Sequence, residues 1–184
     1  MGANESRQHK RLFLALYPGL DQRQQLHDVV VRQIPDLLVE QYKPVPIANL
    51  HMTLLFLGRA NPDVQACIES VSAQVAMSPV TITLDRLSFW PRKRMLWVTP
   101  DPDNLPKSLI LLVESLGDVL SGCEVPLEQQ QYRPHVTLAR KLTRSPGNCR
   151  IQPVCWTLDH FALMESVSTP AGVRYPVVKS WSLR

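Results

Sequence analysis

The 184-residue sequence lacks long apolar runs and has only four cysteines. No run approaches the ~20 apolar residues that a membrane-spanning helix needs, so we expect no membrane association. The first ten residues are polar and charged and do not resemble a secretory signal. The cysteines show no CxxC spacing, and without a signal we expect reduced thiols: these are Cys67, Cys123, Cys149 and Cys155. Together these absences predict a cytoplasmic protein.

Several common catalytic motifs are also missing. The sequence contains no GxxxxGK[ST] or GxGxxG loop, so nucleotide cradles of those kinds are unsupported. It has no GxSxG nucleophile elbow and no HExxH or paired-cysteine metal motif. We therefore expect no metal site and no cofactor.

Composition is ordinary for a globular protein, with 45% hydrophobic and 20% charged residues. The net charge of +4 is compatible with an anionic ligand but does not identify one. A chain of this length suits one domain. We expect a flexible leader over residues 1–10, a single two-lobed domain over residues 11–184, and a monomer.

The sequence carries one short pattern twice. His51-Met52-Thr53-Leu54 and His135-Val136-Thr137-Leu138 both read His-x-Thr-Leu, 84 positions apart (135 − 51). Both copies lie in runs rich in apolar and β-branched residues, which predicts strands. Residues i and i+2 share one face of a strand, so each histidine points the same way as its threonine.

Two histidine–threonine pairs suit phosphate chemistry. A histidine gives or takes a proton near neutral pH, and a threonine hydroxyl can donate a hydrogen bond to a phosphate oxygen. One strand histidine alone would more often be a core residue held by a backbone carbonyl. The repetition with threonine at i+2 favours catalysis by His51 and His135 and phosphate binding by Thr53 and Thr137.

The duplicated motif and its flanks resemble the 2H phosphoesterase superfamily. Within it the chain is most similar to RNA 2′,3′-cyclic phosphodiesterases, historically called 2′-5′ RNA ligases. The resemblance covers roughly residues 10 to 184, and it rests on four segments: 11–16, 49–58, 94–98 and 132–140. It implies an α+β fold of two pseudo-symmetric lobes, each an antiparallel sheet with outer helices, flanking a central cleft that holds both motifs.

The resemblance also implies a reaction. The expected substrate is RNA with a 2′,3′-cyclic phosphate end, or a 2′,3′-cyclic nucleotide, which is hydrolysed to a 2′-phosphate. His51 is expected to donate a proton to the 3′ oxygen, and His135 to accept one from water. The same chemistry run backwards would give 2′-5′ ligation. The resemblance further suggests that Arg140 binds phosphate, although five residues from His135 is the opposite face of an ideal strand; a bulge near Ala139 would reconcile the two.

Aromatic and basic residues near the motifs could either support the fold or contact the substrate. Phe56 has the same spacing problem relative to His51, and we expect it in the core. Tyr132 precedes the second motif and is a candidate for stacking on a base. Trp90 and Trp97 would stack likewise or fill the core. The basic residues 92–94 are expected to form a solvated hairpin turn, with an RNA contact as the alternative.

Hydropathy and turn signals predict the following elements. Strands are expected at 11–18, 51–58, 80–90, 94–100, 134–139, 156–168 and 173–183. Helices are expected at 21–34, 61–76 and 104–120, the second with Asn61 as its cap and Pro62 at its first position.

Two functions of other classes remain open at this point. The chain is alternatively a nucleotide-binding module that has lost turnover, or an RNA-interaction protein that uses the basic turn. The first would bind nucleotides without turning them over. The second would bind RNA with a steep salt dependence and keep doing so without either histidine.

Overall fold

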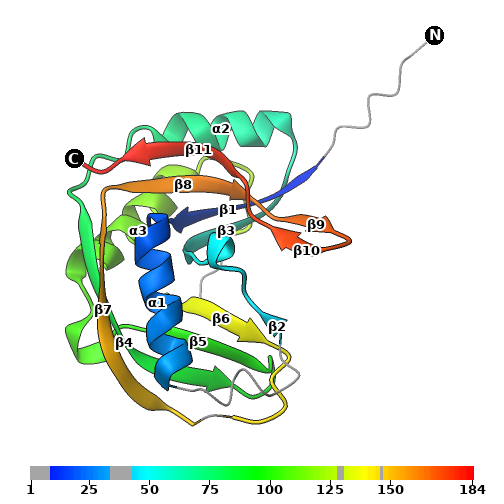
Figure 1. The fold of residues 1–184 in the computed structure, drawn as a ribbon. Coiled ribbons are helices and arrows are strands. Elements are labelled where there is room, and N and C mark those ends of the chain that lie inside the picture. Colours follow the sequence, from blue (N-terminus) through cyan, green and yellow to red (C-terminus); the bar gives the residue numbers. More distant parts are fainter. Residues whose placement is uncertain (1–8, 34–42, 128–130, 146) are drawn as a thin grey trace.

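The computed structural model describes residues 9–33, 43–127, 131–145 and 147–184 (Figure 1). Its main sheet is antiparallel, with strands in the order β11-β8-β1-β3-β6-β5-β4-β7. The first lobe contains β11 (Val177–Ser182), β8 (His160–Glu165), β1 (Lys10–Leu16) and β3 (Met52–Ala60). The second contains β6 (Val136–Arg140), β5 (Met95–Thr99), β4 (Val80–Trp90) and β7 (Cys149–Leu158), with the short β2 (Lys43–Pro44) beside β6. The predicted α+β fold of two antiparallel lobes is confirmed.

Among the described strands, one antiparallel bridge joins the two lobes. It pairs Met52 of β3 with Val136 of β6. These are the middle residues of the two His-x-Thr motifs. The lobes therefore meet where the motifs lie.

Three helices cover the lobes and tie them together. Helix α1 (Leu20–Gln33) follows a first-lobe strand but packs against β7 of the second lobe. Helix α3 (Lys107–Leu120) follows a second-lobe strand but packs against β3 of the first, next to α2 (Pro62–Ser72). Because each lobe contributes a helix that covers the other, the lobes form one unit. No helix in the described ranges is long and apolar enough to cross a membrane.

Local sequence explains these helices. The Asn61 side chain accepts a hydrogen bond from the Val64 amide at 2.9 Å, and Pro62 begins α2, as predicted. Helix α3 buries Leu109, Leu112, Leu116 and Leu120, whose spacing of three or four residues makes one apolar face. It begins at Lys107 rather than at residue 104, because Pro102–Asn104 forms a separate 3₁₀ turn, η3.

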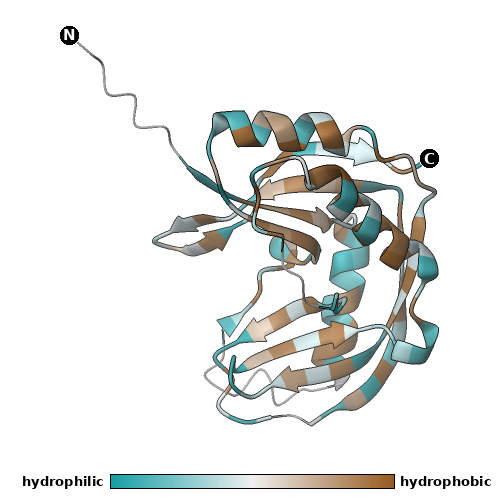
Figure 2. Ribbon diagram, turned by 180° about the vertical axis from the view of Figure 1, so that it is seen from behind, coloured by the Kyte–Doolittle hydropathy of each residue, from teal (hydrophilic) through white to brown (hydrophobic). Residues whose placement is uncertain are grey.

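The core lies between the sheet and the helices. Leu12, Leu14 and Leu16 of β1 belong to it, whereas Phe13 and Ala15 face the opposite side of the strand. Hydrophobic and hydrophilic residues alternate along the second-lobe strands (Figure 2). This alternation buries one face of each strand and leaves the other available for a site.

The predicted strand 156–168 is wrong in its extent. The chain forms β7, breaks at Asp159, and continues as β8 and then β9 (Val167–Thr169), which pairs with β10 (Gly172–Arg174). Strand β7 pairs with β4 of the second lobe, whereas β8 pairs with β1 of the first. The alternating pattern continues across this change of lobe, so periodicity alone does not reveal it.

Two further expectations need correction or limits. Strand β1 begins at Lys10, inside the expected leader, and pairs this residue with Ala60; residues 1–8 lie outside the described part of the chain. Cys67 and Cys123 form a disulfide, with α carbons 5.9 Å apart, so the expectation of reduced thiols is wrong for this pair. The cysteines meet because α2 packs on α3, a contact that their spacing in sequence does not encode. Cys149 and Cys155 are free.

Candidate active site

The bridge between Met52 and Val136 brings the two His-x-Thr motifs together. In an antiparallel register centred on this pair, His51 lies toward Thr137, and Thr53 lies toward His135. The side chains of the bridge residues are buried. Because neighbours along a strand point to opposite faces, both histidines and both threonines project on the other side, toward one site.

Each histidine is held by the same local contact. His51 Nδ1 lies 2.6 Å from the Asn49 carbonyl oxygen, and His135 Nδ1 lies 2.8 Å from that of Arg133. A carbonyl oxygen only accepts, so both Nδ1 atoms carry the proton and donate it. The Nε2 atom of each neutral ring is then left as a proton acceptor for the chemistry of the site.

A β-bulge in β6 explains why Arg140 lies on the same face of the strand as Thr137. In β6, Thr137 pairs with Trp97 and Ala139 pairs with Leu96, so Leu138 is an extra residue. This shift returns Arg140 to the face of Thr137. The guanidinium of Arg140 and the hydroxyl of Thr137 both contact the Met95 sulfur, at 3.3 and 3.6 Å. A thioether is a weak acceptor, so an anion can readily take over both donors.

The corresponding bulge in β3 corrects the expectation for Phe56. Ala15 pairs with Thr53 while Leu14 pairs with Leu55, so Leu54 is the extra residue. Phe56 therefore lies on the motif face, and it is 55% exposed rather than in the core. Phe56 and Arg140 each lie five residues after their histidine. The site is thus asymmetric, with a cation at this position on one side and an aromatic ring on the other.

Aromatic rings surround both histidines. The rings of Phe13 and Tyr175 lie 5.0 and 4.8 Å from that of His51. The rings of Trp90 and Trp97 lie 4.9 and 5.8 Å from that of His135. Sequence reasoning considered the tryptophans but missed Phe13 and Tyr175. Alternation along β1 was the available signal for Phe13, whereas Tyr175 lies 124 residues from His51 (175 − 51) in a segment with no motif.

These surroundings favour the neutral form of both histidines. Burial is the main cause that lowers the pKa of His51, to about 4, with smaller contributions from the charges of His135 and Arg140. Burial likewise lowers the pKa of His135, helped by the charges of Lys93 and Arg140. Burial therefore favours two neutral imidazoles beside a cationic guanidinium, an arrangement that would attract an anion together with a proton.

Contacts from outside the motifs fix the segments that lead into them. Arg23 is buried and donates to the Tyr17 hydroxyl at 2.6 Å and the Ala48 carbonyl at 2.7 Å, just before the first motif. Thr99 donates to the Pro134 carbonyl at 2.7 Å, just before the second. Such contacts limit movement of the histidine backbones.

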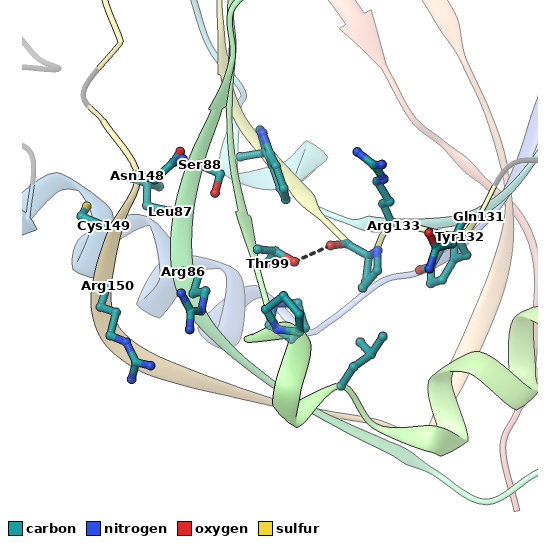
Figure 3. Close-up of a pocket in the computed structure, with 15 residues that line it drawn as sticks. Arg86, Leu87, Ser88, Thr99, Gln131, Tyr132, Arg133, Asn148, Cys149 and Arg150 are labelled. Atoms are coloured by element: carbon teal, nitrogen blue, oxygen red, sulfur yellow. Dashed lines mark hydrogen bonds between the residues drawn. The ribbon is translucent and has the colours of Figure 1, made fainter.

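Tyr132 connects the motifs directly. Its hydroxyl donates to the Thr53 carbonyl at 3.1 Å, and its ring packs against the core. Burial raises the pKa of this hydroxyl, which keeps it protonated as a donor. Tyr132 also lines a cavity next to the second motif (Figure 3). Its role in stacking on a base stays a prediction.

The basic turn at residues 92–94 makes two kinds of contact with the rest of the protein. Arg94 donates to the carbonyls of Leu142 and Lys141, at 2.9 and 3.0 Å, which fixes the chain that leaves β6. The Lys93 ammonium lies 4.8 Å from the centre of the Trp90 ring, so it reaches toward the second motif. The predicted hairpin turn is confirmed, with Arg94 bonded rather than simply solvated.

Within the described residues, no group of three or more His, Cys, Asp or Glu side chains is arranged to hold a metal ion. The groups that the site does offer are two imidazoles, two hydroxyls and one guanidinium. Such groups would suit a phosphate ligand together with two proton transfers, a combination that can support phosphodiester chemistry.

Comparison with known proteins agrees with this class of site. Residues 29–169 match the model of the 2′-5′ RNA ligase superfamily. The chain belongs to this superfamily, which confirms the resemblance seen in the sequence.

Curated relatives share one name. The RNA 2′,3′-cyclic phosphodiesterase of Escherichia coli is 27% identical over 95% of this chain and 97% of its own length. That of Thermus thermophilus is 26% identical, over 95% and 90%. The crystal structure of E. coli LigT complexed with 3′-AMP has the same fold, with a TM-score of 0.84 at 24% identity, over 96% of this chain and 99% of that one.

Proposed function

We propose that this protein hydrolyses the 2′,3′-cyclic phosphate ends of RNA to 2′-phosphates by acid–base catalysis with two histidines. The observation that carries the proposal is the bridge between Met52 and Val136, which directs both His-x-Thr pairs to one site. The names of the relatives from E. coli and T. thermophilus supply the substrate class.

The two histidines have different tasks in this reaction. His135 accepts a proton from water, which attacks phosphorus and forms a new P–O bond. The bond from phosphorus to the ribose 3′ oxygen breaks, and His51 donates its proton to that oxygen. The product keeps its phosphate on the 2′ oxygen. Each proton moves through Nε2, because Nδ1 is bonded to a backbone carbonyl on both rings.

Three donors hold the phosphate. The hydroxyls of Thr53 and Thr137 and the guanidinium of Arg140 bind its non-bridging oxygens and stabilise the charge that develops on them. Arg140 is suited to this role because its guanidinium donates to the Met95 sulfur, a weak acceptor that an anion can displace.

The substrate itself sets the protonation state that the mechanism needs. His51 must be protonated to act as an acid, yet burial lowers its pKa to about 4. A bound phosphodiester brings a negative charge next to this ring and offsets the charge of Arg140. The pKa of His51 rises when the anion binds, so the site takes up a proton together with its substrate.

Two other features belong to the proposal. The reaction needs no metal ion, because protonation of the leaving oxygen replaces Lewis-acid assistance. Run in reverse, the same groups would join a cyclic end to a 5′-hydroxyl end in a 2′-5′ linkage. A cytoplasmic location and a monomeric state also stay predictions.

Turnover of a 2′,3′-cyclic nucleotide by the purified protein tests the proposal, with and without excess chelator. His51→Ala and His135→Ala should each lower kcat by about 10²–10⁴-fold. His27→Ala is a matched control, since His27 lies on α1 and contacts Asp28 rather than the site. Near-normal turnover in either motif variant would refute acid–base catalysis. Loss of activity with chelator, restored by a divalent ion, would refute the metal-free mechanism.

A further inference from the structure

A cavity of about 640 Å³ lies beside the second motif, on the exposed side of the second-lobe sheet (Figure 3). Trp97, whose ring is 5.8 Å from that of His135, lines it. So does Arg133, whose carbonyl accepts the His135 Nδ1 proton. The cavity therefore continues from the active site, yet neither catalytic histidine lines it. Its volume is in the range of small-molecule binding sites.

Two arginines line one end of the cavity. Arg86 of β4 and Arg150 of β7 lie opposite each other in the sheet. Both guanidinium groups donate to the same carboxylate oxygen of Asp101, and the bond from Arg150 is 3.2 Å long. The Asp101 side chain is only 5% exposed, whereas that of Arg150 is 71% exposed. Within this triad two cations face one buried anion, and Asp85 and Asp103 also lie near Arg86, so the charge that the triad presents to solvent is that of Arg150.

Aromatic surface lies in the same cavity. Trp97 and Tyr132 both line it, and Figure 3 shows Tyr132 at the end opposite Arg86 and Arg150, with Thr99 between them. An arginine pair with nearby aromatic rings is typical of sites for single-stranded RNA, where phosphates meet cations and bases stack on rings.

The arginine pair is too far along the sheet to hold the reacting phosphate. Thr137 pairs with Trp97, Trp97 pairs with Ser88, and Arg86 lies two residues further along β4. With strands ~4.8 Å apart and ~3.4 Å per residue, the α carbons of Thr137 and Arg86 are about 12 Å apart. Both guanidinium groups are moreover held at Asp101, which follows β5. They are positioned for a second phosphate.

We propose that this cavity binds the nucleotide on the 5′ side of the cyclic phosphate, with a backbone phosphate on Arg86 and Arg150. This inference rests on the proposed function. A cyclic phosphate occupies both the 2′ and the 3′ oxygen of the last ribose, so the rest of the strand leaves through its 5′ oxygen. That strand must lie along the surface next to the histidines, where the cavity offers cations and aromatic rings. The preferred substrate is then an RNA strand rather than a free cyclic nucleotide.

The test compares two substrates: a four-nucleotide RNA with a 2′,3′-cyclic end, and adenosine 2′,3′-cyclic phosphate. Arg150→Gln removes the charge but keeps a polar side chain. It should lower the ratio of kcat/KM values, tetramer to mononucleotide, by about tenfold or more, the effect of losing one charge-assisted hydrogen bond. For the tetramer, the slope of log(kcat/KM) against log[salt] should fall in magnitude by about 0.7.

Arg32→Ala is the charge-matched control, because Arg32 is exposed on α1 and bonded to the Asp28 carbonyl. It should leave the ratio unchanged. An unchanged ratio in Arg150→Gln, as expected if the cavity received a protein segment instead, would overturn the inference while leaving the proposed function intact. If wild-type protein hydrolysed neither substrate, the proposed function would fail. Fluorescence anisotropy with a 3′-phosphate tetramer would then still test the cavity, since equal affinities of wild type and Arg150→Gln would overturn the RNA contact.

Discussion

Anion binding should load a proton onto His51, and this proton can be counted. With a pKa of about 4, His51 would be about 3% protonated at pH 5.5 before an anion binds. If a bound anion restores the ordinary value of about 6.5, the protonated fraction becomes about 90%. The difference is about 0.9 proton taken up per site. The same shift corresponds to roughly 3 kcal/mol of coupling between the anion and the proton.

Isothermal titration calorimetry at pH 5.5 measures this uptake, in two buffers of different ionisation enthalpy. Sulfate is a suitable tetrahedral probe because it does not itself titrate near this pH. Wild-type protein should take up about one proton more per bound sulfate than His51→Gln, which cannot be protonated. His27→Gln is the control for a histidine outside the site and should behave like wild type.

The sign of the pH dependence follows from the same shift. Because burial lowers the pKa of His51, its ring stays neutral below pH 6.5 until an anion binds. Anion binding then takes up a proton, so anion affinity should rise as the pH falls from 6.5 toward 4. Equal proton uptake by wild type and His51→Gln would refute the reasoning, because it would mean that the anion does not change the charge of His51.

Three other predictions concern catalysis and stability. If His51 protonates the leaving oxygen, an activated phosphodiester with a better leaving group should partly rescue His51→Ala but not His135→Ala; equal rescue would mean that the roles are shared. Arg140→Ala should lower kcat/KM by about 10- to 100-fold through loss of charge-assisted bonds to phosphate, and a value near wild type would remove Arg140 from the phosphate site. Reducing the disulfide between Cys67 and Cys123, which spans 56 residues, should lower the free energy of unfolding by about 4 kcal/mol. Denaturant titration with and without reductant measures this, and equal midpoints would show that the bond adds no stability.

Sequence alone predicted the motifs, their strands and the class of fold. A repeated histidine with threonine at i+2 is a local signal, and strand alternation converts it directly into a shared face. The Asn61 cap and the leucine spacing of α3 are equally local. Such features need no knowledge of what packs where.

The features that sequence reasoning missed depend on contacts between distant segments. The bulge at Leu54 moved Phe56 from the expected core to the motif face, and a bulge is defined by pairing with a neighbouring strand. Tyr175 reaches His51 only because β8 and its neighbours return to the first lobe. The disulfide likewise reflects the packing of α2 on α3. An equal spacing of five residues from each histidine to Phe56 and Arg140 was the one signal in the sequence that the two positions correspond.

The position of the phosphate in the product tests the central claim most directly. RNA with a 2′,3′-cyclic phosphate end should be incubated with the protein in chelator and ¹⁸O-labelled water, and the product examined by ³¹P NMR and mass spectrometry. We predict a terminal 2′-phosphate that carries one ¹⁸O atom, formed by wild type and not by His135→Ala over the same period. A 3′-phosphate product would contradict the assignment of the leaving oxygen. An intact cyclic end with wild-type protein would contradict the proposed function itself.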